Sequence, residues 1–464
     1  MGKPHVYAEI KRVYLLGIGG IGMSALARYF HAKGLQVAGY DRTPSELTRT
    51  LEREGMAVHY ADDVNLIPAD FLTPSPESLI IYTPAIPGDM REKLFLLEAG
   101  HQLYKRAEVL GLISRAYTTL AVAGTHGKTT TSTMLAHMLS AARGCTAFLG
   151  GVSRSDNSNL ILPKQHSDLL VAEADEFDRS FLHLTPQVTA VTSVSPDHLD
   201  IYGTPERLVE TFRQFAGQNT SRRLIVQAEA ACHFEGLDLD VCTYSASGQA
   251  DYQAENISYN GLCHFTLSSP VSGRSRVTMR LGGKHNIENA VAAIAMAEQL
   301  GIPPADLLPA LENFQGVKRR FEVYHVGARG VFIDDYAHHP DEIRATIRAV
   351  RTMFPTRHLT VIFQPHLYSR TRDFLAGFAD ALAGADSAIL IPIYPAREEP
   401  ILGIDSKLII DRMPEGVRKV YTEKHLLADV LAREETDVVL SMGAGSIGEL
   451  APQLAEVIML KEKA

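Results

Sequence analysis

The residues with the clearest chemical potential form the segment Gly124-Thr125-His126-Gly127-Lys128-Thr129-Thr130, which lies between a predicted strand at Thr118 to Ala123 and a predicted helix. Glycine allows backbone N–H groups to close around phosphate oxygens, and a helix N-terminus adds partial positive charge. Lys128 can then reach the β- and γ-phosphates of a nucleotide, and Thr129 can ligate Mg²⁺. Val122 stands where the general phosphate-binding loop has its first glycine, so this is a shorter G-T-x-G-K-T form. The segment predicts a site for ATP and magnesium.

Two polar segments follow apolar strands and extend this prediction. Glu173 follows a strand expected at Asp168 to Ala172 and opens the acidic run Glu173-Ala174-Asp175-Glu176. His198 follows a strand expected at Val188 to Val194. Strand ends of this kind face the ligand crevice of an open α/β sheet, and carboxylate oxygens suit Mg²⁺. Glu173 is therefore a predicted metal ligand, and His198 is expected to face the same crevice.

A second glycine motif, Gly17-Ile18-Gly19-Gly20-Ile21-Gly22, lies after the predicted strand Val13 to Leu16, and Asp41 ends the next strand. This pattern fits G-x-G-x-x-G with an acidic residue about 20 positions further on, the dinucleotide fingerprint. The glycines indicate only a diphosphate near a helix N-terminus. An NAD(P)-dependent oxidoreductase and a protein that binds a UDP-sugar both satisfy them. The ATP-type loop favours the UDP-sugar, because a dehydrogenase has no use for that loop.

The elements that must position these motifs alternate between strand and helix, which predicts an α/β fold with mostly parallel sheets. The length of 464 residues suits about three domains, with boundaries predicted at 1–103, 104–317 and 318–464. A stretch at about 240–282 is more β-like, and a helix is expected from about Ile287 to Leu300. Further strands are expected at Gln36 to Tyr40, Ser78 to Tyr82, Val331 to Ile333, Leu359 to Phe363, Ala388 to Ile393 and Val438 to Met442.

Composition excludes several classes of function. The net charge of −9 argues against a general nucleic-acid binder. The four cysteines form no C-x-x-C pair, which favours free thiols in a reducing compartment over a zinc site. The first twelve residues are polar and charged, without the apolar core of a signal peptide, and no apolar run is long enough to span a bilayer. We therefore expect a cytoplasmic protein that binds neither nucleic acid nor membrane.

Seven segments, in order along the chain, resemble the Mur ligase family. The resemblance implies a Rossmann-like UDP-binding domain, a P-loop ATPase-like central domain and a Rossmann-like C-terminal domain. It covers nearly the whole chain, and the order of the segments makes it specific. The segments are Leu16 to Ser24, Ala123 to Thr131, Glu173 to Glu176, Pro196 to Asp200, Gly283 to Ala290, Arg319 to Glu322 together with Asp334 to Pro340, and Gln364 to Arg372.

The resemblance also implies a role for individual residues. Lys128, Glu173, His198 and Arg320 would be catalytic; Thr129 and Glu173 would hold one Mg²⁺, and Glu173 and His198 a second. ATP would contact Gly124 to Thr130, Asn286, Asn289, Arg320, Asp335 and Tyr336. The UDP-substrate would contact Gly17, Gly19, Gly20, Ile21, Gly22, Met23, Ser24 and Asp41, and the amino acid would contact His338, His366 and Arg370.

The implied activity is that of an ATP-dependent acid–amino-acid ligase in peptidoglycan precursor synthesis. The segment Gln364 to Arg372 is similar to the branch that joins L-alanine to the carboxylate of UDP-N-acetylmuramate through an acyl phosphate. A monomer or weak homodimer is expected. The alternatives are the family's recycling branch, which attaches a whole tripeptide, and an NAD(P)-dependent oxidoreductase. Folylpolyglutamate synthetase and a non-catalytic nucleotide-binding regulator fit less well.

Two departures from the family pattern affect these expectations. Leu367 replaces an arginine that commonly follows the histidine of the amino-acid motif, so recognition of the alanine carboxylate would rest on His366 and Arg370. Several relatives use a carbamylated lysine after the His198 motif to bridge magnesium. No lysine lies between His198 and Arg223, so no such group is predicted here.

Overall fold

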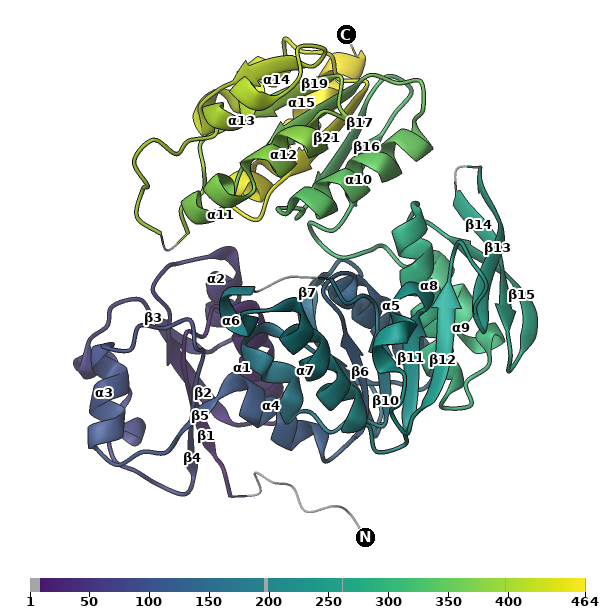
Figure 1. The fold of residues 1–464 in the computed structure, drawn as a ribbon. Helices are drawn as coiled ribbons and strands as arrows, with labels where there is room; N and C mark the ends of the chain where they lie inside the picture. Colours follow the sequence, from purple (N-terminus) through teal and green to yellow (C-terminus); the bar gives the residue numbers. More distant parts are fainter. Residues whose placement is uncertain (1–8, 196–198, 261, 397, 464) are drawn as a thin grey trace. The chain divides into compact units, whose positions relative to one another are not determined.

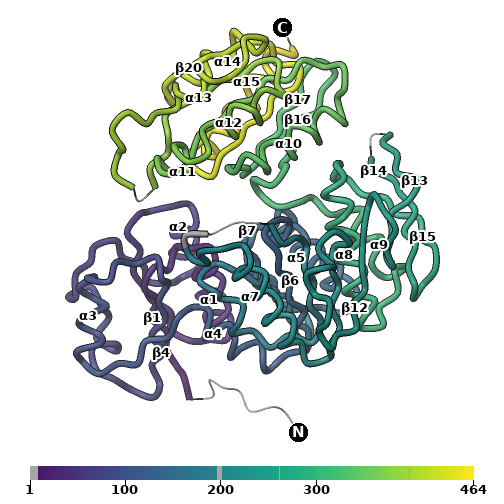
Figure 2. Tube along the Cα trace, in the orientation of Figure 1, coloured from purple at the N-terminus to yellow at the C-terminus, as the bar shows by residue number. Residues whose placement is uncertain are grey.

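The computed structural model describes residues 9–195, 199–260, 262–396 and 398–463 and divides into two compact units. The first unit contains Met1–Leu281 with His285–Gln315, and the second contains Gly282–Lys284 with Gly316–Ala464. Figure 1 labels their helices and strands, and Figure 2 follows the chain trace through both. Within the described ranges, no helix is long and apolar enough to cross a membrane.

The first unit begins with a five-stranded parallel sheet in the order β3-β2-β1-β4-β5. Successive residues of β1 enter two different cores: Val13 and Leu15 join one cluster, and Tyr14 and Leu16 join the other. Burial on both faces explains why this strand is a continuous apolar run rather than an alternating one. The elements are β1 (Arg12–Leu16), α1 (Ile21–Ala32), β2 (Gln36–Tyr40), α2 (Glu46–Arg53), β3 (Ala57–His59), β4 (Ser78–Tyr82), α3 (Arg91–Glu98), β5 (Leu103–Lys105) and α4 (Arg106–Ser114).

The same unit continues into a ten-stranded sheet in the order β15-β14-β13-β12-β11-β10-β6-β9-β7-β8. Its centre is parallel, and β7–β8 and β13–β14–β15 pair antiparallel. The strands are β6 (Thr118–Ala123), β7 (Thr146–Ser153), β8 (Ser158–Ile161), β9 (Leu169–Glu173), β10 (Val188–Val191), β11 (Arg223–Gln227), β12 (Asp240–Ser245), β13 (Tyr252–Asn260), β14 (Leu262–Ser269) and β15 (Gly273–Met279). The helices are α5 (Lys128–Ala142), α6 (Leu199–Tyr202), α7 (Pro205–Gly217), α8 (Lys284–Glu298) and α9 (Pro304–Asn313).

Local sequence signals explain several of these elements. Helix α5 begins directly after Gly127, whose φ of +83° is a left-handed conformation that glycine adopts without a steric penalty. Helix α7 begins with a Thr204 cap, whose hydroxyl accepts a hydrogen bond from the Arg207 N–H, followed by a proline at the first helical position. Strand β14 alternates between buried and half-buried residues, as expected for a strand with one face on the core.

The second unit contains a six-stranded sheet in the order β16-β17-β21-β18-β19-β20, in which only β16 runs antiparallel among the described strands. Separate apolar clusters cover its two faces. The strands are β16 (Glu322–Val326), β17 (Val331–Asp335), β18 (Leu359–Phe363), β19 (Ser387–Leu390), β20 (Arg418–Tyr421) and β21 (Val438–Met442). The helices are α10 (Pro340–Met353), α11 (Tyr368–Asp373), α12 (Leu375–Leu382), α13 (Lys407–Arg412), α14 (Leu427–Leu431) and α15 (Ala451–Lys463).

The predicted α/β class is confirmed, and five predicted strands have the expected bounds: β2, β4, β6, β18 and β21. Other bounds were wrong by a few residues. The helix expected from Ile287 begins at Lys284, and the strand expected to reach Ile393 ends at Leu390. The strand expected to end at Val194 ends at Val191, because the residues that follow turn toward the glycine loop after β6 and bond to it.

Candidate functional site

The loop between β6 and α5 is held by hydrogen bonds to the residues that follow β10, from both its backbone and the Thr125 hydroxyl. Gly124 and Gly127 both have positive φ, +133° and +83°. The Thr125 N–H donates to the Ser193 carbonyl at 3.1 Å, and the His126 N–H donates to the Ser193 hydroxyl at 2.8 Å. The segment after β10 therefore supports this loop, which the local sequence pattern did not indicate.

Gly124→Ala is expected to destabilise the protein by about 2 kcal/mol or more and to weaken binding of Mg-ATP. A Cβ atom at this position would lie 2.8 Å from the Ser193 nitrogen and 2.9 Å from the Thr192 nitrogen, and backbone atoms cannot rotate away. Urea unfolding and calorimetric titration with a non-hydrolysable ATP analogue measure the two effects. Gly217→Ala is the matched control, because its Cβ would meet nothing within 4 Å. Equal behaviour of the two variants would contradict the expectation.

Lys128, the first residue of α5, lies at the mouth of this loop. Its ammonium donates to the Gly124 carbonyl at 2.7 Å and to both Glu176 carboxylate oxygens, at 2.9 and 2.7 Å. Burial lowers the pKa of Lys128, but the negative charges of Glu176, Asp175 and Glu173 outweigh burial and raise it overall. The ammonium is therefore a fixed positive charge. Glu176 belonged to the predicted acidic run without an assigned role, and its pairing with Lys128 is new.

Glu173 ends β9 beside the first turn of α5. Its carboxylate accepts hydrogen bonds from the Thr129 hydroxyl and from the Gly150 N–H, both at 2.9 Å. A Cβ at position 150 would lie 2.3 to 2.4 Å from the Glu173 carboxyl atoms, so a larger residue there would displace the Glu173 side chain from this position. The fold thus brings together the two oxygen ligands predicted for magnesium that lie in the described residues.

These ligands suit Mg²⁺ rather than a metal held by protein alone. Among the residues that the structure describes, no group of three or more His, Cys, Asp and Glu side chains could hold a metal ion. Magnesium commonly binds one or two protein oxygens together with phosphate oxygens and water. The hydroxyl of Thr129 and the carboxylate of Glu173 fit that pattern beside a phosphate loop. His198, the third predicted ligand, lies outside the described residues.

Asn286 and Asn289, the two residues predicted to face the adenine, lie on the first turns of α8 and are both buried. The Asn289 side-chain oxygen accepts a hydrogen bond from the Thr131 hydroxyl at 3.0 Å. A Cβ on Gly127 would lie 2.7 Å from that same oxygen. Asn289 therefore contacts the glycine loop and its helix. Contact of Asn286 and Asn289 with adenine stays a prediction.

The glycine turn at the carboxyl end of β1 is also held by a residue that follows a neighbouring strand. The Gly19 N–H donates to the Asp41 carboxylate at 2.8 Å, so Asp41 fixes the turn itself. Gly17 has a φ of +88°. The guanidinium of Arg106 lies where a Cβ on Gly22 would stand, 2.7 Å from Nη1. Arg106 brings a positive charge to the start of α1, and no motif in the sequence had indicated it.

Gly20, Ile21, Met23 and Ser24, the other predicted UDP contacts, begin α1. Gly20 is its N-cap residue, and the side chains of Met23 and Ser24 are buried. The Ser24 hydroxyl donates to the Ile21 carbonyl at 3.0 Å. Any contact of Met23 with a diphosphate would therefore come from its backbone N–H at the helix N-terminus. The Ser24 N–H already donates to the Gly20 carbonyl at 2.9 Å.

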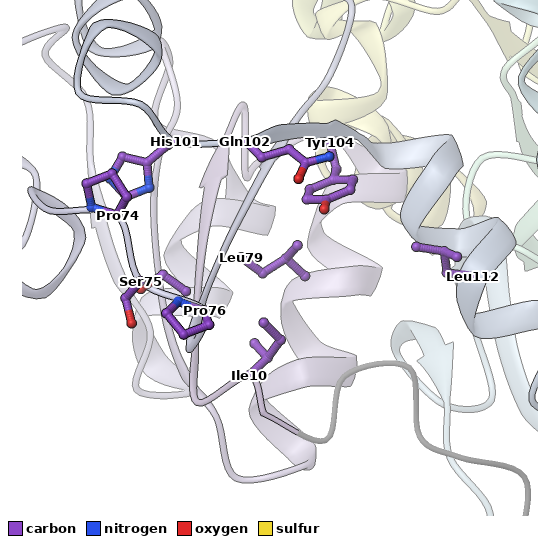
Figure 3. A pocket seen from close by; sticks show the side chains of 10 residues that line it. Ile10, Pro74, Ser75, Pro76, Leu79, His101, Gln102, Tyr104 and Leu112 are labelled. Atoms are coloured by element: carbon purple, nitrogen blue, oxygen red, sulfur yellow. The ribbon is translucent and has the colours of Figure 1, made fainter.

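A cavity of about 420 Å³ lies at the end of the five-stranded sheet opposite the glycine turn (Figure 3). Its lining includes Ile10 before β1, Ser78 at the start of β4 and Gln102 before β5, so it stands at the amino ends of these strands. Ligands of open α/β sheets bind at the carboxyl ends. The cavity is thus distinct from the glycine turn. Its other lining residues are Pro74, Ser75, Pro76, Leu79, His101, Tyr104 and Leu112.

In the second unit, two arginines flank Tyr336. The guanidinium carbons of Arg319 and Arg320 lie 5.1 and 5.0 Å from the Tyr336 ring centroid, within range of a cation–π interaction. Arg319 also lies 3.5 Å from the Asp334 carboxylate. Both Asp335 oxygens accept backbone hydrogen bonds, from Phe321 at 2.6 Å and from Ala337 at 2.7 Å. Asp335 therefore connects the end of strand β17 to the backbone that follows Arg319 and Arg320. Its contact with the ribose stays a prediction.

The predicted amino-acid residues gather beyond the carboxyl ends of β17 and β18. The rings of His338 and His366 lie 6.0 Å apart, and His366 stacks on Tyr394 at 5.8 Å. Burial lowers the pKa of His338. Arg370 on α11 has a buried Nη1 without a hydrogen-bond partner in the described part of the chain. Leu367, the departure from the family pattern, has a φ of +70°, a strained backbone for a residue with a side chain.

Asp334 is expected to make the second unit less stable as the pH rises. Burial raises the pKa of Asp334 to about 7, although Arg319 opposes this. A folded-state pKa above the unfolded value means that the folded state holds the proton more tightly between them. The free energy of unfolding should therefore fall by about 3 kcal/mol between about pH 5 and about pH 8, and Asp334→Asn should remove most of this fall.

Urea unfolding with hydrogen exchange at the β17 amides measures this effect in the full chain. Asp341→Asn, at an exposed position of α10, is the control and should keep the pH dependence of the unsubstituted protein. Parallel curves for all three proteins would refute the role of Asp334.

Comparison with known protein families agrees with this geometry. Residues 12–118 match the Mur ligase family, catalytic domain; residues 122–297 match the Mur ligase middle domain; and residues 319–445 match the Mur ligase, glutamate ligase domain. The three matches follow one another along the chain and together cover most of it. They correspond to the three sheets described above.

Individual relatives are similar over nearly their full length. The UDP-N-acetylmuramate–L-alanine ligase of Phocaeicola vulgatus is 44% identical over 97% of this chain and 99% of its own. The enzyme of the same name from Porphyromonas gingivalis is 48% identical over 95% and 97%. The crystal structure of the UDP-N-acetylmuramate–alanine ligase of Thermotoga maritima aligns with a TM-score of 0.82 at 28% identity, covering 98% of this chain and all of that one. The chain therefore belongs to the Mur ligase family.

Proposed function

We propose that the protein joins L-alanine to the carboxylate of UDP-N-acetylmuramate, with conversion of ATP to ADP and phosphate, in peptidoglycan precursor synthesis. The observation that carries this proposal is the phosphate loop, where Lys128 lies at the loop and the Thr129 hydroxyl donates to the Glu173 carboxylate. The relatives that match this chain over nearly their full length are named for the same activity. We further propose that the reaction takes place in the cytoplasm, where ATP and UDP-linked precursors are available.

The reaction needs an activated carboxyl group, because a free carboxylate is a poor electrophile at neutral pH. A carboxylate oxygen attacks the γ-phosphorus and ADP leaves, which gives an acyl phosphate. The neutral amine of alanine then attacks the acyl carbon, phosphate leaves, and the nitrogen loses its proton. Excluding water during these steps protects the acyl phosphate from hydrolysis.

The chain's own residues supply charge neutralisation and orientation. Lys128 and Arg320 would reduce the repulsion between the γ-phosphate and the incoming carboxylate, the main lever in phosphoryl transfer. Thr129 and Glu173 would hold one Mg²⁺, and Glu173 with His198 a second. Bound magnesium would supply further positive charge. Asn286, Asn289, Asp335 and Tyr336 would face the nucleoside.

The substrate assignments follow the sheets. We assign residues 1–103 to the UDP-substrate, 104–317 to ATP and 318–464 to the amino acid. Arg370 is the best-supported amino-acid contact, since a buried guanidinium nitrogen without a partner in the described chain suits a carboxylate. His338 and His366 would complete that site.

The deciding experiment measures ADP release by the purified protein with Mg-ATP and UDP-N-acetylmuramate, adding either L-alanine or the tripeptide L-Ala-γ-D-Glu-meso-diaminopimelate. Turnover with alanine alone is the expected result. Turnover with tripeptide alone would move the protein to the recycling branch of the family. Turnover with neither would overturn the proposal, and a nicotinamide-dependent oxidation would be tested next.

A further inference from the structure

The β7–β8 hairpin contacts both nucleotide half-sites of the first unit. Asn159 on β8 is fully buried and bonds to the first turn of α1, where the glycine turn ends. Gly150 on β7 donates its N–H to Glu173 at 2.9 Å. One hairpin therefore contacts the predicted UDP-diphosphate turn through β8 and the predicted magnesium ligand through β7.

The side-chain amide of Asn159 has only one chemically consistent orientation. Its Nδ2 donates to the Ile21 carbonyl and to the Ser24 hydroxyl, the latter at 2.9 Å. Its Oδ1 accepts from an Arg28 Nη1, and a guanidinium can only donate. Arg28 is itself anchored by Glu54 through Nε, at 2.8 and 3.0 Å to the two carboxylate oxygens. Each polar atom of the Asn159 side chain thus has a partner on α1.

Apolar contacts support the same junction. Tyr29 on α1 lies 5.3 Å from Phe148 on β7, ring centroid to ring centroid. Phe148 pairs with Leu160, the residue after Asn159, in the β7–β8 ladder. The hairpin is consequently held against α1 at two neighbouring points, and a buried, fully bonded amide allows few alternative arrangements.

We infer that Asn159 is a positioning residue for the UDP-substrate: it comes from the ten-stranded sheet and fixes the helix turn that binds the diphosphate. This inference rests on the proposed function. It gives Asn159 no contact with substrate. Its effect passes through Ile21 and Ser24, whose place at the start of α1 sets the direction of the backbone N–H groups there. The same hairpin holds Glu173 through Gly150, so the two half-sites share one support.

Asn159→Asp tests this most directly, because Asp keeps the oxygen that Arg28 needs and loses both N–H donors. The affinity for UDP-N-acetylmuramate should weaken about tenfold or more, and the affinity for a magnesium complex of a non-hydrolysable ATP analogue should stay within about twofold. Ser24→Ala removes the Ser24 hydroxyl with its bonds to Asn159 and to the Ile21 carbonyl, and keeps the bond from Asn159 to the Ile21 carbonyl. It should weaken UDP-substrate binding by a smaller factor in the same direction. The double variant should lose less affinity for UDP-N-acetylmuramate than the product of the two separate fold-changes, because both substitutions remove the same Asn159–Ser24 contact.

Calorimetric binding of each nucleotide and the KM for each substrate are the readouts, with melting temperature as the check of folding. Asn313→Asp is the matched control, an exposed asparagine on α9 that bonds only to the Pro309 carbonyl in the described structure. An equal loss of affinity for UDP-N-acetylmuramate and for the ATP analogue, or an unchanged affinity for UDP-N-acetylmuramate, would overturn the inference. If Asn159→Asp does not fold, the Ser24→Ala result decides in the same way.

The unsubstituted protein separates this inference from the proposed function. If it neither binds UDP-N-acetylmuramate nor turns it over with alanine, the proposed function has failed. If it does both and the variants match it, only the role of Asn159 has failed.

Discussion

Lys128→Ala is expected to lower kcat by at least about a thousandfold and to leave the affinity for UDP-N-acetylmuramate within about twofold. The ammonium of Lys128 is the fixed charge at the mouth of the phosphate loop, bonded to the Gly124 carbonyl and to Glu176. The glycine turn that should bind the UDP-diphosphate belongs to a different sheet, so its affinity should be insensitive to this change. Steady-state kinetics and calorimetry measure the two parts of the result.

A loss of stability could imitate a loss of catalysis, because the substitution removes the Lys128 ammonium from beside the buried Glu176 carboxylate. The double variant Lys128→Met, Glu176→Gln removes both charges and should recover the melting temperature without recovering turnover. Lys164→Ala, at an exposed loop position, controls for the removal of a lysine as such. Near-normal turnover by Lys128→Ala would remove the phosphate-loop assignment.

Glu173→Gln is expected to raise the Mg²⁺ concentration for half-maximal activity about tenfold or more and to lower kcat about a hundredfold. The Glu173 carboxylate lies between the Thr129 hydroxyl and the Gly150 N–H, and Gln can still accept one of these hydrogen bonds. The substitution therefore removes the negative charge with little change of shape. A magnesium titration of ADP release measures it, with Glu235→Gln at an exposed position as the control.

Gly150→Ala provides an independent route to the same effect. The new Cβ would lie within 2.4 Å of the Glu173 carboxyl atoms and would displace that flexible side chain rather than the backbone. The magnesium requirement should rise in this variant too, with the carboxylate chemically intact. A magnesium titration identical to that of the unsubstituted protein in both variants would show that Glu173 is not a ligand.

The sequence alone determined the α/β class, the strand–loop–helix context of both glycine motifs and the place of Glu173 at a strand end. These features are local: apolar runs identify buried strands, and glycines mark turns at the helix N-terminus. Asp41 was likewise found by its spacing from the first motif, and the structure places its carboxylate on the Gly19 N–H.

Only the tertiary structure decided which side chains complete the sites. Ser193 supports the phosphate loop because β10 lies beside β6 in the sheet, and this neighbour relation also ended β10 earlier than its apolar pattern predicted. Glu176 pairs with Lys128, Arg106 lies against Gly22, and Asn159 bonds to Ser24 across 135 positions of the chain. Periodicity and spacing carry no signal for such contacts, because they depend on how separate elements pack, and that packing is a property of the folded chain.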